Sequence, residues 1–138
     1  MNEAERRRRV AEARVGCLAT VDEAGRPHLV PFCFVLDGDT LYSAIDRKPK
    51  RTADLKRLEN VRANPRVSVL VDHYEDDWSR LWWVRLDCWA RVVEQAVERG
   101  RALELLAAKY TQYRAEPPEG PVLAIEIERW RAWSSAGG

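Results

Sequence analysis

The chain has 138 residues, with 23 lysines and arginines against 22 aspartates and glutamates and a formal net charge of +1. This length predicts a single domain over residues 1–138. The balanced charge argues against a nucleic-acid-binding protein, which usually carries a basic excess along one face. The cysteines, Cys17, Cys33 and Cys88, are widely spaced among apolar residues, so we expect reduced thiols in a cytoplasmic protein. After the arginine run at 6–9, no uninterrupted apolar stretch resembles a signal or membrane segment.

The first third of the chain predicts one helix and then strands joined by tight turns. The segments are a helix over 3–14, a strand over 15–21, a turn at 22–25, a strand over 27–36, a turn at 37–39 and a strand over 40–46. Because each connection is short, we expect these three strands to form a meander.

The remainder alternates helices with strands. The predicted segments are a helix over 52–63 with Leu55, Leu58 and Val61 on one face, a strand over 67–71, an acidic loop at 73–77, a strand over 82–93, a helix carrying Leu103, Leu106, Ala107 and Tyr110, and a strand over 122–131. Strands outnumber helices in an antiparallel order. The pattern therefore predicts a mainly β (α+β) fold, a barrel of about six strands with capping helices.

Cations are concentrated in one short segment. Four of the five residues from Arg47 to Arg51 are lysine or arginine. Pro49 favours a loop there, and Thr52 can cap the helix that follows, which leaves backbone N–H groups free for an anion. The segment predicts a phosphate-binding socket, and the alternative is a solvated surface loop.

All six tryptophans fall in two regions, at 78–89 and at 130–133. On a strand, Trp83 and Trp89 share one face and Trp82 takes the other, so the rings cannot all enter one core. Some rings should therefore face a planar ligand or a partner. The alternative is ordinary packing in the core or at a dimer contact.

Other catalytic arrangements find little support. His28 and His73 are the only histidines, which are too few to place a Ser-His-Asp triad without known geometry. Residues 72–77 lack paired metal-ligand spacing, so we predict no metal site. The glycine patterns of dinucleotide and ATP sites are absent from the sequence.

Several segments together resemble a known family. They are 14–21 (RVGCLATV), 25–32 (GRPHLVPF), 48–52 (KPKRT), 64–85 (NPRVSVLVDHYEDDWSRLWWVR) and 128–134 (ERWRAWS). The chain resembles the pyridoxamine 5′-phosphate oxidase-like split-barrel family, and the 64–85 block is similar to its branch that uses the deazaflavin coenzyme F420. The resemblance runs from Glu12 to Ser134.

This resemblance implies an FMN-binding type of split β-barrel that forms a homodimer with cofactor sites at the subunit interface. It implies a phosphate held by Lys48, Lys50, Arg51 and Thr52. It also implies that Pro31 and Phe32 run beside the ring system. The residues approaching that ring, from the other subunit, are Trp78, Trp82, Trp83 and Arg85. The sequence departs from the family at Cys88-Trp89, where glycine and a small residue are common, which puts the local strand geometry in question.

The implied chemistry is hydride transfer between coenzyme F420 and a small organic acceptor, with orientation supplied by the protein. Tyr74, His28 and Arg85 are candidate proton donors or orienting groups. FMN is the rival cofactor, because a lysine and arginine socket accepts either phosphate. Lys56, Arg57 and Arg80 are candidates for binding the acidic tail of F420. A protein that binds a flavin or deazaflavin without turnover is the remaining alternative.

Overall fold

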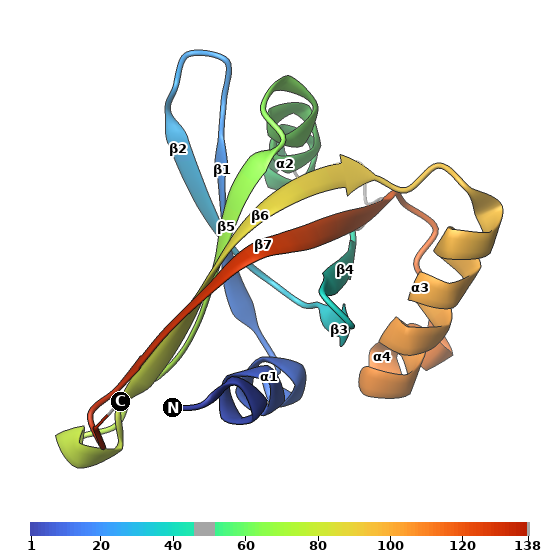
Figure 1. Cartoon of the computed structure of the whole chain (residues 1–138). Coiled ribbons are helices and arrows are strands. Elements are labelled where there is room, and N and C mark those ends of the chain that lie inside the picture. Colours follow the sequence, from blue (N-terminus) through green and yellow to red (C-terminus); the bar gives the residue numbers. More distant parts are fainter. Residues whose placement is uncertain (46–51, 138) are drawn as a thin grey trace.

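One antiparallel sheet curls into half of a barrel in the computed structural model, which describes residues 1–45 and 52–137 (Figure 1). Its strands are β1 (Gly16–Val21), β2 (Pro27–Phe32), β3 (Val35–Asp37), β4 (Thr40–Ala44), β5 (Arg66–His73), β6 (Trp82–Val92) and β7 (Val122–Ser134). The helices are α1 (Glu3–Glu12), α2 (Thr52–Ala63), α3 (Ala96–Lys109) and α4 (Thr111–Ala115), with a 3-10 turn, η1 (Trp78–Arg80). The described residues thus supply seven strands where about six were expected, and the predicted mainly β class is confirmed.

The strand order is β2-β1-β5-β6-β7-β4-β3, which corrects the predicted meander. The segment expected to be one strand over 27–36 breaks at Cys33 and Phe34, so β2 stays at one edge of the sheet while β3 joins β4 at the other. Phe34 is fully buried, and side chains bind its backbone. Its N–H donates to the Tyr110 hydroxyl at 3.2 Å, and its carbonyl accepts from Lys109 Nζ at 2.7 Å.

The turn between β1 and β2 forms as expected from its sequence. The Asp22 carboxylate accepts from the backbone N–H groups of Ala24 and Arg26, both at 2.9 Å. Gly25 has a φ of 83°, a conformation that favours glycine. The turn therefore closes a regular hairpin, in which Val21 lies opposite Pro27.

The core lies inside the curl of the sheet. Val122, Leu123, Ala124 and Ile125 at the start of β7 are all fully buried, because β7 pairs with β6 on one side and with β4 on the other. On strands β1, β5 and β6, burial alternates along the chain, so alternate side chains enter this core.

Two helices, α2 and α3, close the curl. Of the predicted α2 stripe, Leu58 and Val61 pack on the core, while the Leu55 side chain lies outside the described residues. In α2, Val61 is buried, and the buried Asn60 amide donates to the Thr20 hydroxyl at 3.0 Å. In α3, Ala102 and Leu106 are fully buried. None of the described helices is long and apolar enough to span a membrane.

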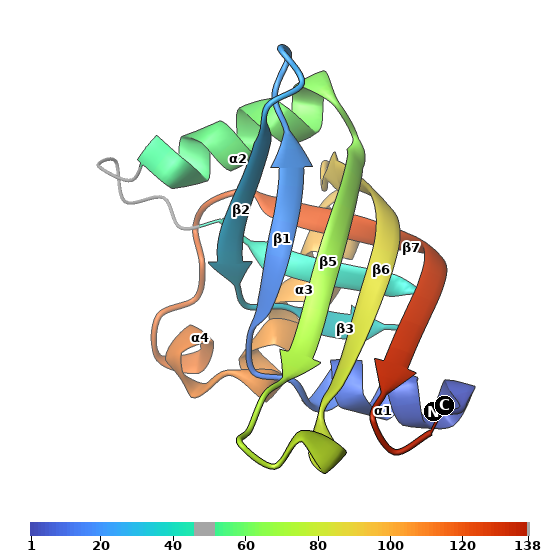
Figure 2. The ribbon, with the colours of Figure 1, turned by 90° about the vertical axis from the view of Figure 1, so that its left-hand side faces the viewer.

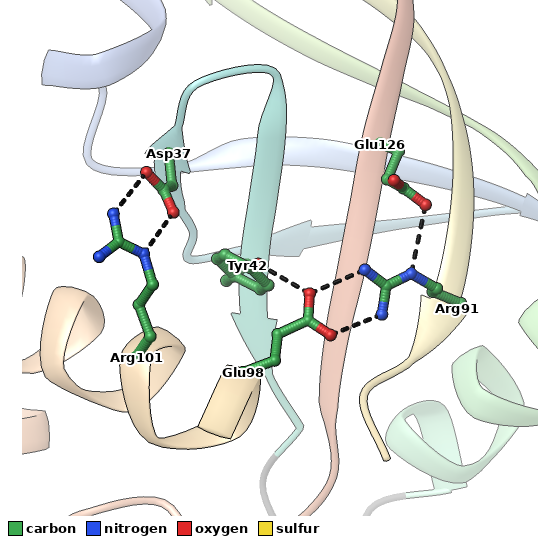
Figure 3. A network of polar contacts seen from close by, with 6 residues as sticks. All are labelled: Asp37, Tyr42, Arg91, Glu98, Arg101 and Glu126. Carbon is green, nitrogen blue, oxygen red and sulfur yellow. Dashed lines mark hydrogen bonds and ion pairs between the residues drawn. The ribbon is translucent and has the colours of Figure 1, made fainter. Parts of the chain in front are cut away.

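A polar network fastens α3 to the sheet (Figure 3). Arg91 on β6 makes two hydrogen bonds to the Glu98 carboxylate, at 2.8 and 2.7 Å, and a third to Glu126 at 3.2 Å. The Tyr42 hydroxyl also donates to Glu98, at 2.8 Å. Arg101 forms a separate bidentate pair with Asp37 at the end of β3.

Among the described elements, no helix covers the face of β2, β1, β5 and β6 that points away from the core, as Figure 2 shows. We call it the outer face. Leu29 and Leu70 on this face have exposed fractions of 70% and 40%. The sheet thus presents apolar side chains to its surroundings on this side.

Candidate functional site

An aromatic groove of about 370 Å³ lies on the outer face, at the end of the sheet formed by the last residues of β5 and the first residues of β6. Its lining residues are Leu70, Asp72, His73, Tyr74, Leu81, Trp82, Trp83, Arg85 and Trp133. Three of the predicted cofactor residues, Trp82, Trp83 and Arg85, therefore meet in one groove.

The register of the sheet places these side chains. Trp83 lies opposite Asp72 on β5 and opposite Trp133 on β7, and Arg85 lies opposite Leu70. Alternation along β6 puts Trp83 and Arg85 on the outer face, while Val84 between them is fully buried. Arg85 is held by an ion pair with Asp87 at 3.5 Å.

Trp82 points the other way and forms the boundary of the groove. It packs against the core, and the Arg9 guanidinium of α1 lies 4.9 Å from its ring centroid. The His73 ring stacks on it with a centroid separation of 6.2 Å, and His73 Nε2 pairs with the Glu75 carboxylate. Contacts from α1 and β5 therefore fix this indole.

Trp78 does not join the groove lining. It lies in η1, where the Asp77 side chain caps the turn by accepting from the Ser79 N–H. Trp78 is 68% exposed, and its Nε1 donates to the Tyr74 hydroxyl at 3.4 Å. Trp78 thus lies apart from Trp82, Trp83 and Arg85, the other residues predicted to approach the cofactor ring.

Pro31 and Phe32 point to opposite sides of β2. Pro31 lies on the outer face in the same row as Cys17, Leu70 and Arg85. Phe32 is 4% exposed and packs within the core, so only its backbone is available to a ligand.

The predicted phosphate socket falls largely outside the described residues, since Lys48, Lys50 and Arg51 are not among them. Helix α2 begins at Thr52, as expected. Its middle lies beside the end of β1, where Lys56 Nζ is 4.0 Å from the Asp22 carboxylate.

Helix α2 and the aromatic groove lie at opposite ends of the sheet (Figure 2). Helix α2 lies beside the Val21 end of β1. The groove lies at the other end of the sheet, past Gly16. Lys56 and Arg80, both proposed for an acidic tail, are also far apart in one chain. A single chain therefore does not gather the described candidate residues into one site.

The residues in the groove fit a flat ring system. Indole rings, Tyr74 and Leu70 provide apolar surface, and Arg85 provides one cation near its edge. Such a surface suits a tricyclic heterocycle with polar edges. The groove offers no second cation for a phosphate among its lining residues, so a phosphate needs an anchor elsewhere.

Sequence reasoning did not assign Trp133 and Leu70 to the site. Both face the groove because of cross-strand register, a property that spacing within one segment does not reveal. Trp133 belongs to the second tryptophan region, and this was the available signal.

The unusual Cys88-Trp89 pair coincides with a register shift between β6 and β7 at Asp87 and Cys88. Trp89 Nε1 donates to Glu128 at 3.0 Å, and Arg66 stacks on the same indole at 4.6 Å from its centroid. Burial raises the pKa of the Cys88 thiol to about 12, so this thiol is held protonated. The Cys88-Trp89 pair thus coincides with irregular strand pairing at the end of the sheet away from the groove.

The alternative catalytic groups are dispersed. His28 lies 3.5 Å from Asp22, while the Ser79 hydroxyl bonds to Asp77 at 2.6 Å. Across 1–45 and 52–137 there is no group of three His, Cys, Asp or Glu side chains placed to hold a metal ion.

The half-barrel, with its two hairpins at opposite edges, defines a split β-barrel protein. The family model described as pyridoxamine 5′-phosphate oxidase matches residues 3–134, and the chain belongs to this family. A search of curated proteins found no match.

Solved structures share the fold at low sequence identity. A conserved hypothetical protein from Mycobacterium tuberculosis is 24% identical, with a TM-score of 0.80 over 98% of this chain and 86% of that one. A FAD-binding protein from Mesorhizobium loti is 23% identical, with a TM-score of 0.72 over 96% and 94%. The heme storage protein HutZ from Vibrio cholerae is 19% identical, with a TM-score of 0.74 over 96% and 93%. At this identity the likeness establishes the fold alone.

Proposed function

We propose that the chain is a coenzyme F420-dependent oxidoreductase that transfers a hydride between the bound deazaflavin and a small organic acceptor. The observation that carries this proposal is the aromatic groove. Trp82, Trp83 and Arg85 come from the block that resembles the F420-using branch, and all three line it.

The proposal includes a homodimer. The groove and the start of α2 lie at opposite ends of one sheet, and this separation supports a site that is built from two copies of the chain. The uncovered outer face, with Leu29 and Leu70 exposed, supports contact between copies on this side. In such a dimer each site takes its phosphate anchors from one chain and its indoles from the other.

Bound F420 supplies a carbon that accepts or donates a hydride, and the protein supplies binding and orientation. Trp83 and Trp133 provide a wall for the ring and exclude water from one side. Arg85 orients a polar edge of the ring or acceptor. Lys48, Lys50 and Arg51 bind the phosphate through charge-assisted hydrogen bonds. A protein nucleophile is not needed for this chemistry.

The main competing function is an FMN-dependent oxidase or reductase of the same fold. The FAD-binding protein from Mesorhizobium loti shows that a similar fold serves a flavin, and the similar fold of HutZ is described as that of a heme storage protein. We favour F420 because of the 64–85 block. We also place the protein in the cytoplasm, with Cys17, Cys33 and Cys88 as thiols.

The test is a pair of titrations of the purified protein with oxidised F420 and with FMN, followed by tryptophan fluorescence. Selective binding of F420 with quenching supports the proposal. Preference for FMN assigns the protein to the flavin-dependent class. Binding of neither removes the proposed function. For the cofactor that binds, oxygen consumption by the reduced complex gives a second criterion, because reduced flavins react with oxygen and reduced deazaflavins scarcely do.

A further inference from the structure

A second hollow of about 440 Å³ adjoins the aromatic groove. The two share His73, Leu81 and Trp82 as lining residues. The other residues that line this hollow are mainly polar. They are the cations Arg9 and Arg80, the hydroxyl residues Ser79 and Ser134, and Ala136. A mostly apolar groove therefore borders a mostly polar hollow.

Arg9 is the distinctive residue of this hollow. Its guanidinium is held over Trp82 at 4.9 Å, and one of its N–H groups contacts Met1 Sδ at 3.9 Å. Within residues 1–45 and 52–137, no carboxylate lies within ion-pair distance of Arg9. A guanidinium has five N–H donors, and stacking on an indole leaves the edge donors free.

Two of the other arginines on α1, Arg7 and Arg8, differ from Arg9. Arg8 pairs with Glu12 at 3.6 Å, and Arg7 pairs with Glu3 and Asp39. Arg9 is thus an oriented, partly buried cation whose charge its described neighbours do not neutralise. Such a cation favours an anionic ligand group.

The other polar residues complete a rim around Arg9. Arg80 Nε lies 3.6 Å from Glu75, which also pairs with His73, so the Glu75 charge is shared between two partners. The Arg80 side chain is 71% exposed and can turn toward a ligand. The hydroxyl of Ser134 lies opposite Trp82 in the sheet register, at the edge of the same hollow.

We infer that this hollow is an anion subsite, and that the acceptor combines a flat apolar body with an anionic substituent such as a carboxylate. The body lies beside the coenzyme ring, at the Trp82 and Leu81 end of the aromatic groove, and the anion binds Arg9 across the boundary that these two residues form. This inference rests on the proposed function, because it assigns the substrate class of that enzyme. It does not depend on which cofactor binds.

The test uses two fluorescent probes with the same aromatic body. The anionic probe is 1-anilinonaphthalene-8-sulfonate, and N-phenyl-1-naphthylamine is its neutral counterpart without the sulfonate. We expect the wild-type protein to bind the anionic probe at least fivefold more tightly. We expect Arg9→Gln to remove this preference while leaving affinity for the neutral probe unchanged.

Arg8→Gln is the matched control, because it removes the same charge from the same helix but outside the hollow. It should retain the preference. Equal affinity of the two probes for the wild-type protein overturns the subsite, and so does an equal loss in both arginine variants. Circular dichroism of each variant confirms that the fold is retained.

A second experiment tests whether the hollow binds the acceptor or the acidic tail of F420. Arg9→Gln should bind F420 with less than a fivefold loss, because Arg9 contacts the groove only through Trp82. A loss of fivefold or more in F420 affinity assigns the hollow to the coenzyme tail and overturns the acceptor subsite. Failure of the wild-type protein to bind F420 removes the proposed function, whereas the probe titrations report on the subsite independently.

Discussion

Trp83 on β6 and Trp133 on β7 lie directly opposite each other, and both line the aromatic groove. Their positions on adjacent strands make one continuous apolar wall, which neither strand provides alone. The wall forms where the sheet is uncovered, so it is available to a ligand or to a second copy of the chain.

We expect Trp83→Ala to weaken F420 binding by about 1 kcal/mol or more, about fivefold in Kd, because one ring of this wall is lost. The measurement is a titration followed by absorbance of the coenzyme. Trp89→Ala is the control, since Trp89 lies on the same strand beside Arg66, outside the groove. Equal losses in the two variants would contradict the placement of the ring against Trp83.

A mixing experiment tests whether each site takes residues from two chains. Lys50→Ala should weaken cofactor binding by about 1–3 kcal/mol through loss of a charge-assisted hydrogen bond. If Lys50 and Trp83 serve one site from different chains, a heterodimer of Lys50→Ala and Trp83→Ala has one intact site and one doubly altered site. We therefore expect half of the sites in reassembled heterodimers to regain wild-type affinity. No recovery would show that each site lies within one chain.

Gly16 marks a close contact in the core. A Cβ at this position would lie 3.0 Å from Phe34, 3.1 Å from Phe32 and 3.3 Å from the Leu70 carbonyl oxygen. We expect Gly16→Ala to lower the free energy of unfolding by about 1–3 kcal/mol, because the two buried rings must shift. Gly100→Ala, in α3 with no atom near the added Cβ, should instead raise it by about 0.5–1 kcal/mol. Urea unfolding of both variants measures these opposite effects.

The pair between Arg91 and Glu98 should make the attachment of α3 sensitive to acid. Hydrogen bonds from Arg91 are the main cause that lowers the pKa of Glu98, with Tyr42 adding to the effect. A lowered folded-state pKa contributes stability that is present above the unfolded value of about 4.3 and lost as the pH falls through the folded value.

We therefore expect wild-type protein to lose more stability than Glu98→Gln between about pH 5 and pH 3. A double-mutant cycle with Arg91→Gln at pH 7 should give a coupling of about 1 kcal/mol, since the pair is bidentate but partly exposed. A coupling near zero would mean that the Arg91–Glu98 pair does not contribute to holding α3 on the sheet.

Lys109 should make the stability of the protein depend on pH in the alkaline range. Burial lowers its pKa to about 8, and nearby Arg14 adds to the shift. The unfolded chain has a lysine pKa of about 10.4, so between these values the unfolded state binds more protons and stability rises with pH.

The raised pKa values of Tyr42 and Tyr110, both about 12, oppose this trend at high pH, so comparison with a variant is needed. Relative to Lys109→Met, the wild-type protein should gain stability from pH 8 to pH 10. Parallel stability profiles of the two proteins would contradict the shifted pKa.

Local signals predicted much of the secondary structure. Helix α2 spans the predicted residues, since Thr52 can begin a helix and Asn64-Pro65 ends one. The break at Phe34 could not be predicted in this way. It depends on Lys109 and Tyr110, which lie far away in sequence and bind the Phe34 backbone in place of a neighbouring strand.

The candidate site shows the same limit. Spacing along β6 correctly placed Trp83 and Trp82 on opposite faces. It could not show that Trp133 joins Trp83, since that depends on the register between β6 and β7. Nor could spacing along β6 show that Trp78 lies in the 3-10 turn η1, which Asp77 caps, and not in the groove lining. Side chains placed by local geometry were predictable, and those placed by pairing between distant strands were not.

Strand β7 imposes an order on assembly during synthesis. The β3–β4 hairpin is made early, but in the described sheet it joins the other strands only through β7, at the C-terminal end of the chain. Until the ribosome has released residues 122–126, the edge of β4 has no partner there. The half-barrel therefore closes only once β7 has been made, and until then the β3–β4 hairpin has an unpaired strand edge that a chaperone has reason to shield.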